Sequence, residues 1–177
     1  QQGFTSQLMT LTNKIALITG GSSGIGHAIA ESLVQAGAKV AITGRQKAKL
    51  EKAARAIGAH AIQADVTNEP DAQRTFREVL GVFGDLDILI NNAGIGVFKP
   101  LVEMDLQSFE RVLATNVTGA MLMGREAAKI FVSRNKGHLV NIASTASLRG
   151  ATNGTAYMTS KFALRGMTEC WRAELRK

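Results

Sequence analysis

Tyr157 and Lys161, near the end of the chain, are spaced so that they could carry out proton chemistry together. They stand four positions apart in a segment with a helical pattern, so both side chains are expected on one face of a helix. A free tyrosine holds its proton too tightly to exchange it well at neutral pH, and an ammonium within about 4–6 Å favours the phenolate. Tyr157 is therefore a candidate acid/base residue. The alternative is a solvated helix face, because two common residues recur at this spacing by chance.

A second candidate site lies in residues 15–26, which read Ile-Ala-Leu-Ile-Thr-Gly-Gly-Ser-Ser-Gly-Ile-Gly. An apolar run of strand length ends at Thr19, glycines follow, and an amphipathic helical pattern then begins. Such a turn lets backbone N–H groups approach a phosphate closely, and the helix dipole there favours negative charge. We expect it to bind the pyrophosphate of a dinucleotide, and a loop without a ligand is the alternative.

Together these motifs resemble the short-chain dehydrogenase/reductase family. The glycine turn matches its T-G-x-x-x-G-I-G pattern, and residues 91–94 match its N-N-A-G segment. Ser144 precedes Tyr157 by thirteen positions, as the family's serine does, and Asn116 stands in a long helical pattern between them. These motifs occur in family order and cover essentially the whole chain. The resemblance implies a catalytic set of Asn116, Ser144, Tyr157 and Lys161.

The resemblance also implies a reaction, the transfer of a hydride between a nicotinamide cofactor and a carbonyl or alcohol, with a 3-oxoacyl compound as one candidate substrate. Tyr157 would donate a proton to the carbonyl oxygen, and Ser144 would hydrogen-bond the same oxygen. Lys161 would hold the nicotinamide ribose, and Asn116 would anchor a water near it. No metal is required, and the three histidines show no metal-ligand spacing. The competing interpretation is a non-catalytic NADP-binding or interaction module, against which the intact catalytic set argues.

The residues after the second expected strand favour NADP over NAD. No carboxylate occurs in residues 40–50, where NAD-preferring Rossmann proteins usually carry one, and Arg45 stands there instead. A guanidinium suits a 2'-phosphate, which a carboxylate would repel. Lys47 and Lys49 also fit the solvated start of a helix. The predicted cofactor-binding residues are Gly20, Ser22, Ser23, Gly24, Ile25, Gly26, Arg45, Asp65, Val66, Asn91, Asn92, Ala93, Gly94, Tyr157 and Lys161.

The remaining pattern alternates strands with helices. After the first strand, strands are expected at residues 39–43, 60–63, 87–90 and 138–143, and helices at 46–57, 69–83, 106–133 and around Tyr157. This predicts a single Rossmann-type domain over residues 1–177, a doubly wound parallel α/β/α fold with the family's strand order 3-2-1-4-5. Gly119 and Gly124 each cost about 1 kcal/mol within a helix, which predicts close packing there. Asp65 could instead cap the next helix or form a turn with Thr67 and Asn68.

Composition narrows the function classes. With 45% hydrophobic and 20% charged residues among 177, the chain is expected to be a soluble globular protein. No apolar run approaches the ~18 residues of a membrane span, and residues 1–12 do not resemble a secretory signal. The single cysteine, Cys170, rules out an intrachain disulfide, favours a cytoplasmic location and is expected to pack beside Trp171. The net charge of +7 is spread among acidic residues, so nucleic-acid binding is not favoured.

Two further expectations concern assembly and extent. Met121, Met123, Ile130 and Phe131 add apolar surface to the long helix, which predicts a homodimer or homotetramer, as the resemblance also implies; burial within a monomer is the alternative. Family members continue past the position of Lys177 with further strand, helix and Pro-Gly cofactor-loop segments. The C-terminal part of the family fold is therefore expected to be absent from these 177 residues, which alone are expected to be poorly active.

Overall fold

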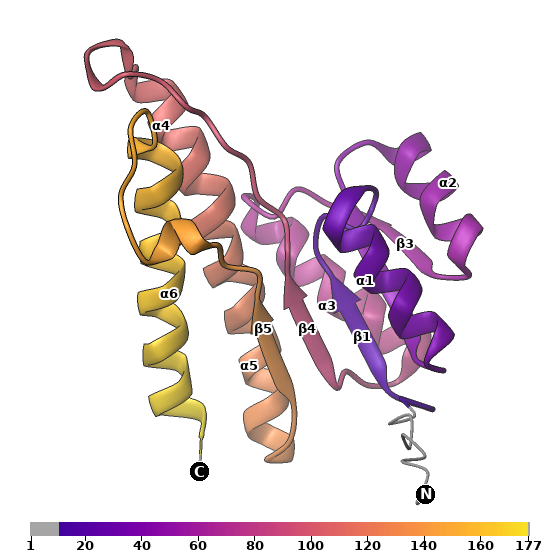
Figure 1. Ribbon diagram of the computed structural model, residues 1–177. Helices are drawn as coiled ribbons and strands as arrows, with labels where there is room; N and C mark the ends of the chain where they lie inside the picture. The colour runs from indigo at the N-terminus through magenta and orange to yellow at the C-terminus, as the bar shows by residue number, and fades with distance from the viewer. Residues whose placement is uncertain (1–10, 177) are drawn as a thin grey trace, which may run out of the picture.

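The computed structural model describes residues 11–176, so the expectation for residues 1–12 falls largely outside it. Five strands form one parallel sheet in the order β3-β2-β1-β4-β5, as predicted (Figure 1). Their bounds are Ile15–Ile18 for β1, Lys39–Gly44 for β2, His60–Gln63 for β3, Ile88–Asn91 for β4 and His138–Asn141 for β5. The helices are α1 (Gly24–Gln35), α2 (Lys47–Ile57), α3 (Glu69–Phe83), α4 (Leu106–Leu113), α5 (Ala120–Arg134) and α6 (Thr155–Leu175). Short helical segments are η1 (Leu101–Glu103), η2 (Ala114–Gly119) and η3 (Thr145–Ser147).

Helices cover both faces of the sheet because its strands are apolar on both sides. Along β1, Ala16 and Ile18 belong to one core cluster, which α1 and α2 complete, and Ile15 and Leu17 belong to the other, which α3 and α5 complete. This alternation has the period of two that a strand imposes, and burial on both faces is typical of parallel sheets. Helix α6 packs against α4 and η3, beside the outer strand β5 (Figure 1). Within residues 11–176, no helix is both long and apolar enough to cross a membrane.

The long helix predicted at residues 106–133 is not uniform. It runs through α4, then through a π-helical segment, η2, and then through α5. The prediction of regular α-helix was therefore wrong at its centre, because residues there are committed to partners distant in sequence. A Cβ atom on Gly119 would lie 2.7 Å from the Val66 side chain, and one on Gly124 would lie 2.9 Å from the Trp171 ring. The close packing predicted at both glycines is confirmed.

The expectation for Cys170 needs correction. Its side chain is exposed, so it is not a packing residue among the described residues. Met123 and Phe131 are buried in the core shared with α3, and Met121 and Ile130 pack against the same cluster. Met123 and Phe131 are thus covered within one chain, whereas Met121 and Ile130 are only partly buried, and the oligomer stays a prediction.

Candidate functional site

A cavity of about 670 Å³ lies at the carboxyl ends of the strands, where ligands bind in open α/β sheets. It joins the glycine turn, the ends of β2 and β3, the segment after β4 and the start of α6. The predicted site residues that line it are Gly20, Ser22, Ser23, Ile25, Arg45, Asp65, Val66, Asn92, Ala93, Gly94, Tyr157 and Lys161. Those that do not line it are Gly24, Gly26, Asn91, Asn116 and Ser144. One continuous cavity therefore brings the expected pyrophosphate turn together with the candidate acid/base pair.

In the glycine turn, the start of α1 packs closely against the backbone of Gly20 and the side chain of Asn92. Gly20 and Gly24 have φ of +67° and +59°, in the left-handed region that glycine adopts most readily. A Cβ atom on Gly26 would lie 2.3 Å from Asn92 Nδ2 and 2.6 Å from the carbonyl oxygen of Gly20. Ser23 is the N-cap of α1, and among the described residues its side chain makes no capping hydrogen bond. The first N–H groups of α1 therefore remain available to an anion at this end of the cavity.

Thr19 connects this turn to the segment after β4. Its hydroxyl oxygen accepts hydrogen bonds from the backbone N–H groups of Asn92 and Ala93, both at 3.0 Å. In return the Asn92 amide donates to the carbonyl oxygens of Thr19 and Gly20 at 2.9 and 3.2 Å. Thr19 is 1% exposed and was not among the predicted site residues. Its signal in the sequence is the threonine that opens the T-G-x-x-x-G-I-G pattern at the end of an apolar strand.

Asn91 forms a second bridge between strands. Its amide donates to Asn141 Oδ1 on β5 at 3.0 Å and to the carbonyl oxygen of Ala120 at 3.1 Å. The Asn141 amide donates in turn to the Thr168 hydroxyl on α6 at 2.8 Å. The two asparagines therefore have different roles: Asn92 holds the glycine turn, and Asn91 links β4 to β5.

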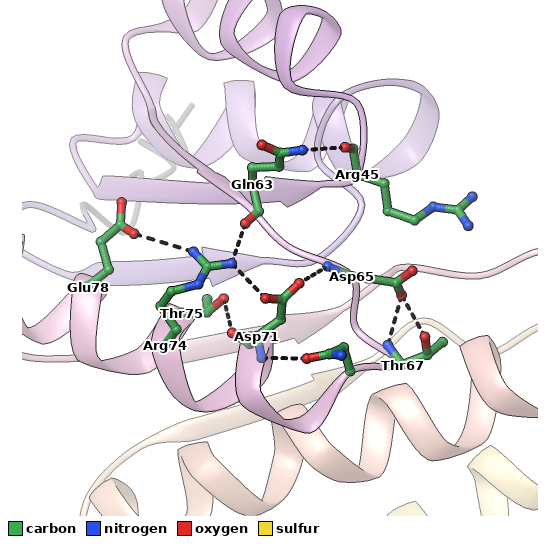
Figure 2. Close-up of polar contacts among 9 residues, drawn as sticks. Arg45, Gln63, Asp65, Thr67, Asp71, Arg74, Thr75 and Glu78 are labelled. Carbon is green, nitrogen blue, oxygen red and sulfur yellow. Dashed lines mark hydrogen bonds and ion pairs between the residues drawn. The ribbon is translucent and has the colours of Figure 1, made fainter.

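The end of β3 is fixed by the first turns of α3 (Figure 2). Asp71 accepts the backbone N–H of Asp65 at 2.9 Å, and this hydrogen bond and the guanidinium of Arg74 hold the pKa of the Asp71 carboxyl below its ordinary value of 3.8. Asp65 Oδ1 accepts from the backbone N–H and hydroxyl of Thr67, whereas Asn68 caps α3. Of the alternatives for Asp65, the turn with Thr67 is thus the one formed, and the residue also lines the cavity.

The same contacts hold the main chain of Arg45. Arg74 donates to the carbonyl oxygen of Gln63 at 2.7 Å, and the Gln63 amide donates to the carbonyl oxygen of Arg45 at 3.0 Å. The guanidinium of Arg45 points away from Gln63 and takes part in none of the contacts drawn in Figure 2. The backbone of Arg45 is therefore fixed while its charged group lies in the cavity wall.

Tyr157 and Lys161 share a face of α6, as their spacing predicts, and both line the cavity. The Lys161 ammonium lies 5.7 Å from the centre of the Tyr157 ring, within the range of a cation–π interaction. It donates to the carbonyl oxygen of Ile142 at 2.7 Å, just beyond β5. Lys161 is only 6% exposed, and burial lowers the pKa of its ammonium. The centre of the Phe98 ring lies 5.3 Å from the centre of the Tyr157 ring, with the two rings tilted by 48°.

Ser144 and Asn116, the other two predicted catalytic residues, do not line the cavity. Ser144 is the N-cap of η3, and its Oγ accepts from the backbone N–H of Ala146 at 3.1 Å, which leaves its own proton free to be donated. Asn116 is 2% exposed, and its amide accepts from the N–H and donates to the carbonyl of Ile95, at 2.8 and 2.9 Å. It also donates to Ser160 Oγ at 2.9 Å. Both N–H groups of Asn116 are therefore used to hold protein, so a water-anchoring role for its side chain stays a prediction.

The parallel sheet, the glycine turn and the Tyr-Lys pair in one cavity define a dinucleotide-binding fold of the Rossmann type. A sequence profile of the family described as short chain dehydrogenase matches residues 14–177, and the chain belongs to this short-chain dehydrogenase/reductase family. The family membership that the order of the motifs predicts is therefore confirmed. The relatives described next are named as reductases or dehydrogenases.

Individual relatives support this assignment. The 3-oxoacyl-[acyl-carrier-protein] reductase FabG of Aquifex aeolicus (strain VF5) is 36% identical over 93% of this chain and 69% of its own length. The secoisolariciresinol dehydrogenase of Forsythia intermedia is 38% identical over 97% of this chain and 65% of its own. The chain thus spans about two thirds of the length of these relatives.

Solved structures are similar throughout the described region. An NAD+-bound xylitol dehydrogenase superposes with a TM-score of 0.88 and 36% identity, covering 93% of this chain and 66% of its own. A 3-ketoacyl-(acyl-carrier-protein) reductase from Brucella melitensis, complexed with NADH, gives a TM-score of 0.89 and 35% identity, covering 94% and 71%. The fold of this chain is therefore the fold of nicotinamide-dependent oxidoreductases of this family.

Proposed function

We propose that this chain supplies the dinucleotide-binding and catalytic residues of an NADP(H)-dependent oxidoreductase that interconverts a carbonyl compound and its alcohol. The observation that carries the proposal is the single cavity that Tyr157 and Lys161 share with the glycine turn and Arg45. The names of the similar reductases make 3-oxoacyl thioesters the first substrates to test.

The residues at the adenine end fit a dinucleotide. The open N-terminus of α1 would hold the pyrophosphate through backbone N–H groups, since side chains are excluded there by left-handed glycines and by the contact of Gly26 with Asn92. Asp65 would lie along the adenine, because its main chain is fixed by Asp71 and its side chain lines the cavity. Arg45 would bind a 2'-phosphate at the end of β2.

The preference for NADP rests on the chemistry at the end of β2. Gly44 stands where NAD-preferring Rossmann proteins usually carry a carboxylate, and the next residue is Arg45. Two similar structures contain NAD+ or NADH, so a comparison of NADPH with NADH on this chain is the decisive measurement.

When bound, the nicotinamide exchanges a hydride with the substrate carbon, and the protein residues handle the accompanying proton. Tyr157 would donate its phenolic proton to the carbonyl oxygen during reduction and take it back during oxidation. Lys161 would stabilise the phenolate, because its buried ammonium is 5.7 Å from the ring. Ser144 would donate its hydroxyl proton in a hydrogen bond to the same oxygen as charge develops. Asn116 would keep the segment after β4 in position beside them.

The test is NADPH oxidation by the full-length protein with a panel of ketones and 3-oxoacyl thioesters. Tyr157→Phe should retain NADPH binding, measured by nucleotide fluorescence, and lose a factor of about 10² to 10⁴ in kcat, since only the proton transfer is removed. Thr159→Ala, an exposed change on the same helix, is the matched control and should keep its activity. Turnover by Tyr157→Phe at the parent rate would overturn the acid/base role, and binding without turnover of any ketone by the parent would favour the non-catalytic module.

A further inference from the structure

Lys47 and Lys49, both in the first turn of α2, have different surroundings. The Lys47 ammonium lies 4.0 Å from a carboxylate oxygen of Glu51, one turn along the same helix. The Lys49 ammonium leaves its own helix and donates to Ser23 Oγ at 3.2 Å. Lys49 lines the cavity together with Arg45, whereas Lys47 does not line it. The two lysines therefore allow a comparison of equal charges in different positions.

The contact with Ser23 places the Lys49 ammonium at the N-terminus of α1. Ser23 is the N-cap of α1, at the end of the glycine turn where N–H groups face the cavity. A Cβ atom on Gly44 would lie 3.4 Å from the Ser22 hydroxyl, so the glycine turn and the end of β2 touch at this point. The Lys49 side chain therefore reaches from α2 to the seam where Gly44, at the end of β2, meets Ser22 and Ser23, and it shares the cavity lining with Arg45.

Among the described residues, neither Arg45 nor Lys49 forms an ion pair with a carboxylate. Asp65 is the one acidic residue in the described lining of the cavity, and its Oδ1 is occupied by Thr67. Lys161, the third cation of the lining, is hydrogen-bonded to Ile142 at the other end. The seam at the end of β2 thus carries two positive charges, which suits a phosphate monoester better than a neutral hydroxyl.

The geometry points to Lys49 as a second cationic ligand of the 2'-phosphate of NADP, acting with Arg45; this inference rests on the proposed function. The hydrogen bond to Ser23 restrains the Lys49 side chain over the seam, which reduces the entropy lost when the phosphate binds. Lys47, held by Glu51 outside the cavity, takes no part.

The experiment measures dissociation constants of NADPH and NADH, by nucleotide fluorescence, for full-length wild type, Lys49→Gln, Lys47→Gln and Arg45→Ala. Lys49→Gln should weaken NADPH binding about tenfold and leave NADH binding within about twofold, as should Arg45→Ala. Lys47→Gln, which removes the same charge two residues away, should change neither by more than about twofold. Adenosine 2',5'-bisphosphate and 5'-AMP should repeat this contrast without the nicotinamide half.

The possible results distinguish the role of Lys49 from the proposed use of NADP(H). A wild type that prefers NADH overturns the proposed cofactor, and with it the role of Lys49. A wild type that prefers NADPH, with no selective loss in Lys49→Gln, overturns only the inference. Equal losses for NADPH and NADH would assign Lys49 to the pyrophosphate instead, and an equal effect of Lys47→Gln would reduce the result to general surface charge.

Discussion

The replacement Asn116→Ala tests whether this side chain holds the candidate site together. Asn116 is 2% exposed, and its amide makes three hydrogen bonds, two with the backbone of Ile95 and one with Ser160. Alanine would leave the half-buried N–H and carbonyl of Ile95 without these partners. A fully buried group left unsatisfied costs about 1–3 kcal/mol, and water reduces this cost at a half-buried one, so the loss in free energy of unfolding should be about 2 kcal/mol.

Urea unfolding of the full-length protein, followed by far-UV circular dichroism, measures this loss as a lower midpoint at an unchanged slope. Thr118→Ala is the matched control, because Thr118 lies in the same π-helical segment and is exposed. It should change stability by less than about 0.5 kcal/mol, since alanine is the better helix former and no buried contact is lost.

The same replacement should also change the cavity. Without Asn116, the segment that contains Ile95 loses its hydrogen bonds to η2, so the affinity for NADPH should fall together with stability. A loss below about 1 kcal/mol in Asn116→Ala would show that Ile95 finds other partners, water included, and that the amide does not fix this segment.

Three further replacements test packing and charge. Gly124→Ala should destabilise by about 1 kcal/mol, because its Cβ would lie 2.9 Å from the Trp171 ring, whereas Gly166→Ala, with nothing within 4 Å, should stabilise by up to about 1 kcal/mol; thermal unfolding compares them, and equal signs would contradict the packing argument. The pKa of Asp71 is lowered mainly by the N–H of Asp65, so the charged carboxylate adds stability above its ordinary pKa of 3.8 that is lost as the pH falls through the lower value in the folded protein. Asp71→Asn should therefore be less stable than wild type at pH 7, with the difference shrinking below about pH 4 in urea unfolding, and a constant difference would refute the role of the charge.

Elements with strong local signals could be predicted closely from the sequence. Helix α3 begins and ends where predicted because Asn68 caps it, Pro70 occupies its first turn and Gly84 adopts the left-handed conformation that ends it. Strand β5 ends at Asn141, two residues earlier than predicted. Its next carbonyl, that of Ile142, accepts the Lys161 ammonium, a partner on another element that no strand pattern indicates.

The candidate site likewise contains residues that could be predicted from the sequence and residues that could not. The glycine turn, the asparagines after β4 and the Tyr157–Lys161 pair are visible as spacings and could be predicted. The contacts of Asn116 could not, because its side chain is hydrogen-bonded to the backbone of Ile95, in a different segment of the chain, and no helical pattern indicates such a partner. Lys49 was equally hidden, since nothing in the sequence separates it from Lys47 until α2 is placed beside the N-cap of α1.

These hidden contacts explain how the two halves of the site are aligned. The glycine turn comes from the first strand, whereas Tyr157 comes from the last helix, so a cofactor that spans both must find them at a fixed separation. Thr19 and Asn92 fasten the turn to the segment after β4. Asn116 fastens the continuation of that segment at Ile95 to Ser160, whose hydroxyl donates to the carbonyl oxygen of Tyr157 at 2.6 Å. Buried, fully satisfied hydrogen bonds of this kind permit little relative movement, and hydride transfer depends steeply on such positioning.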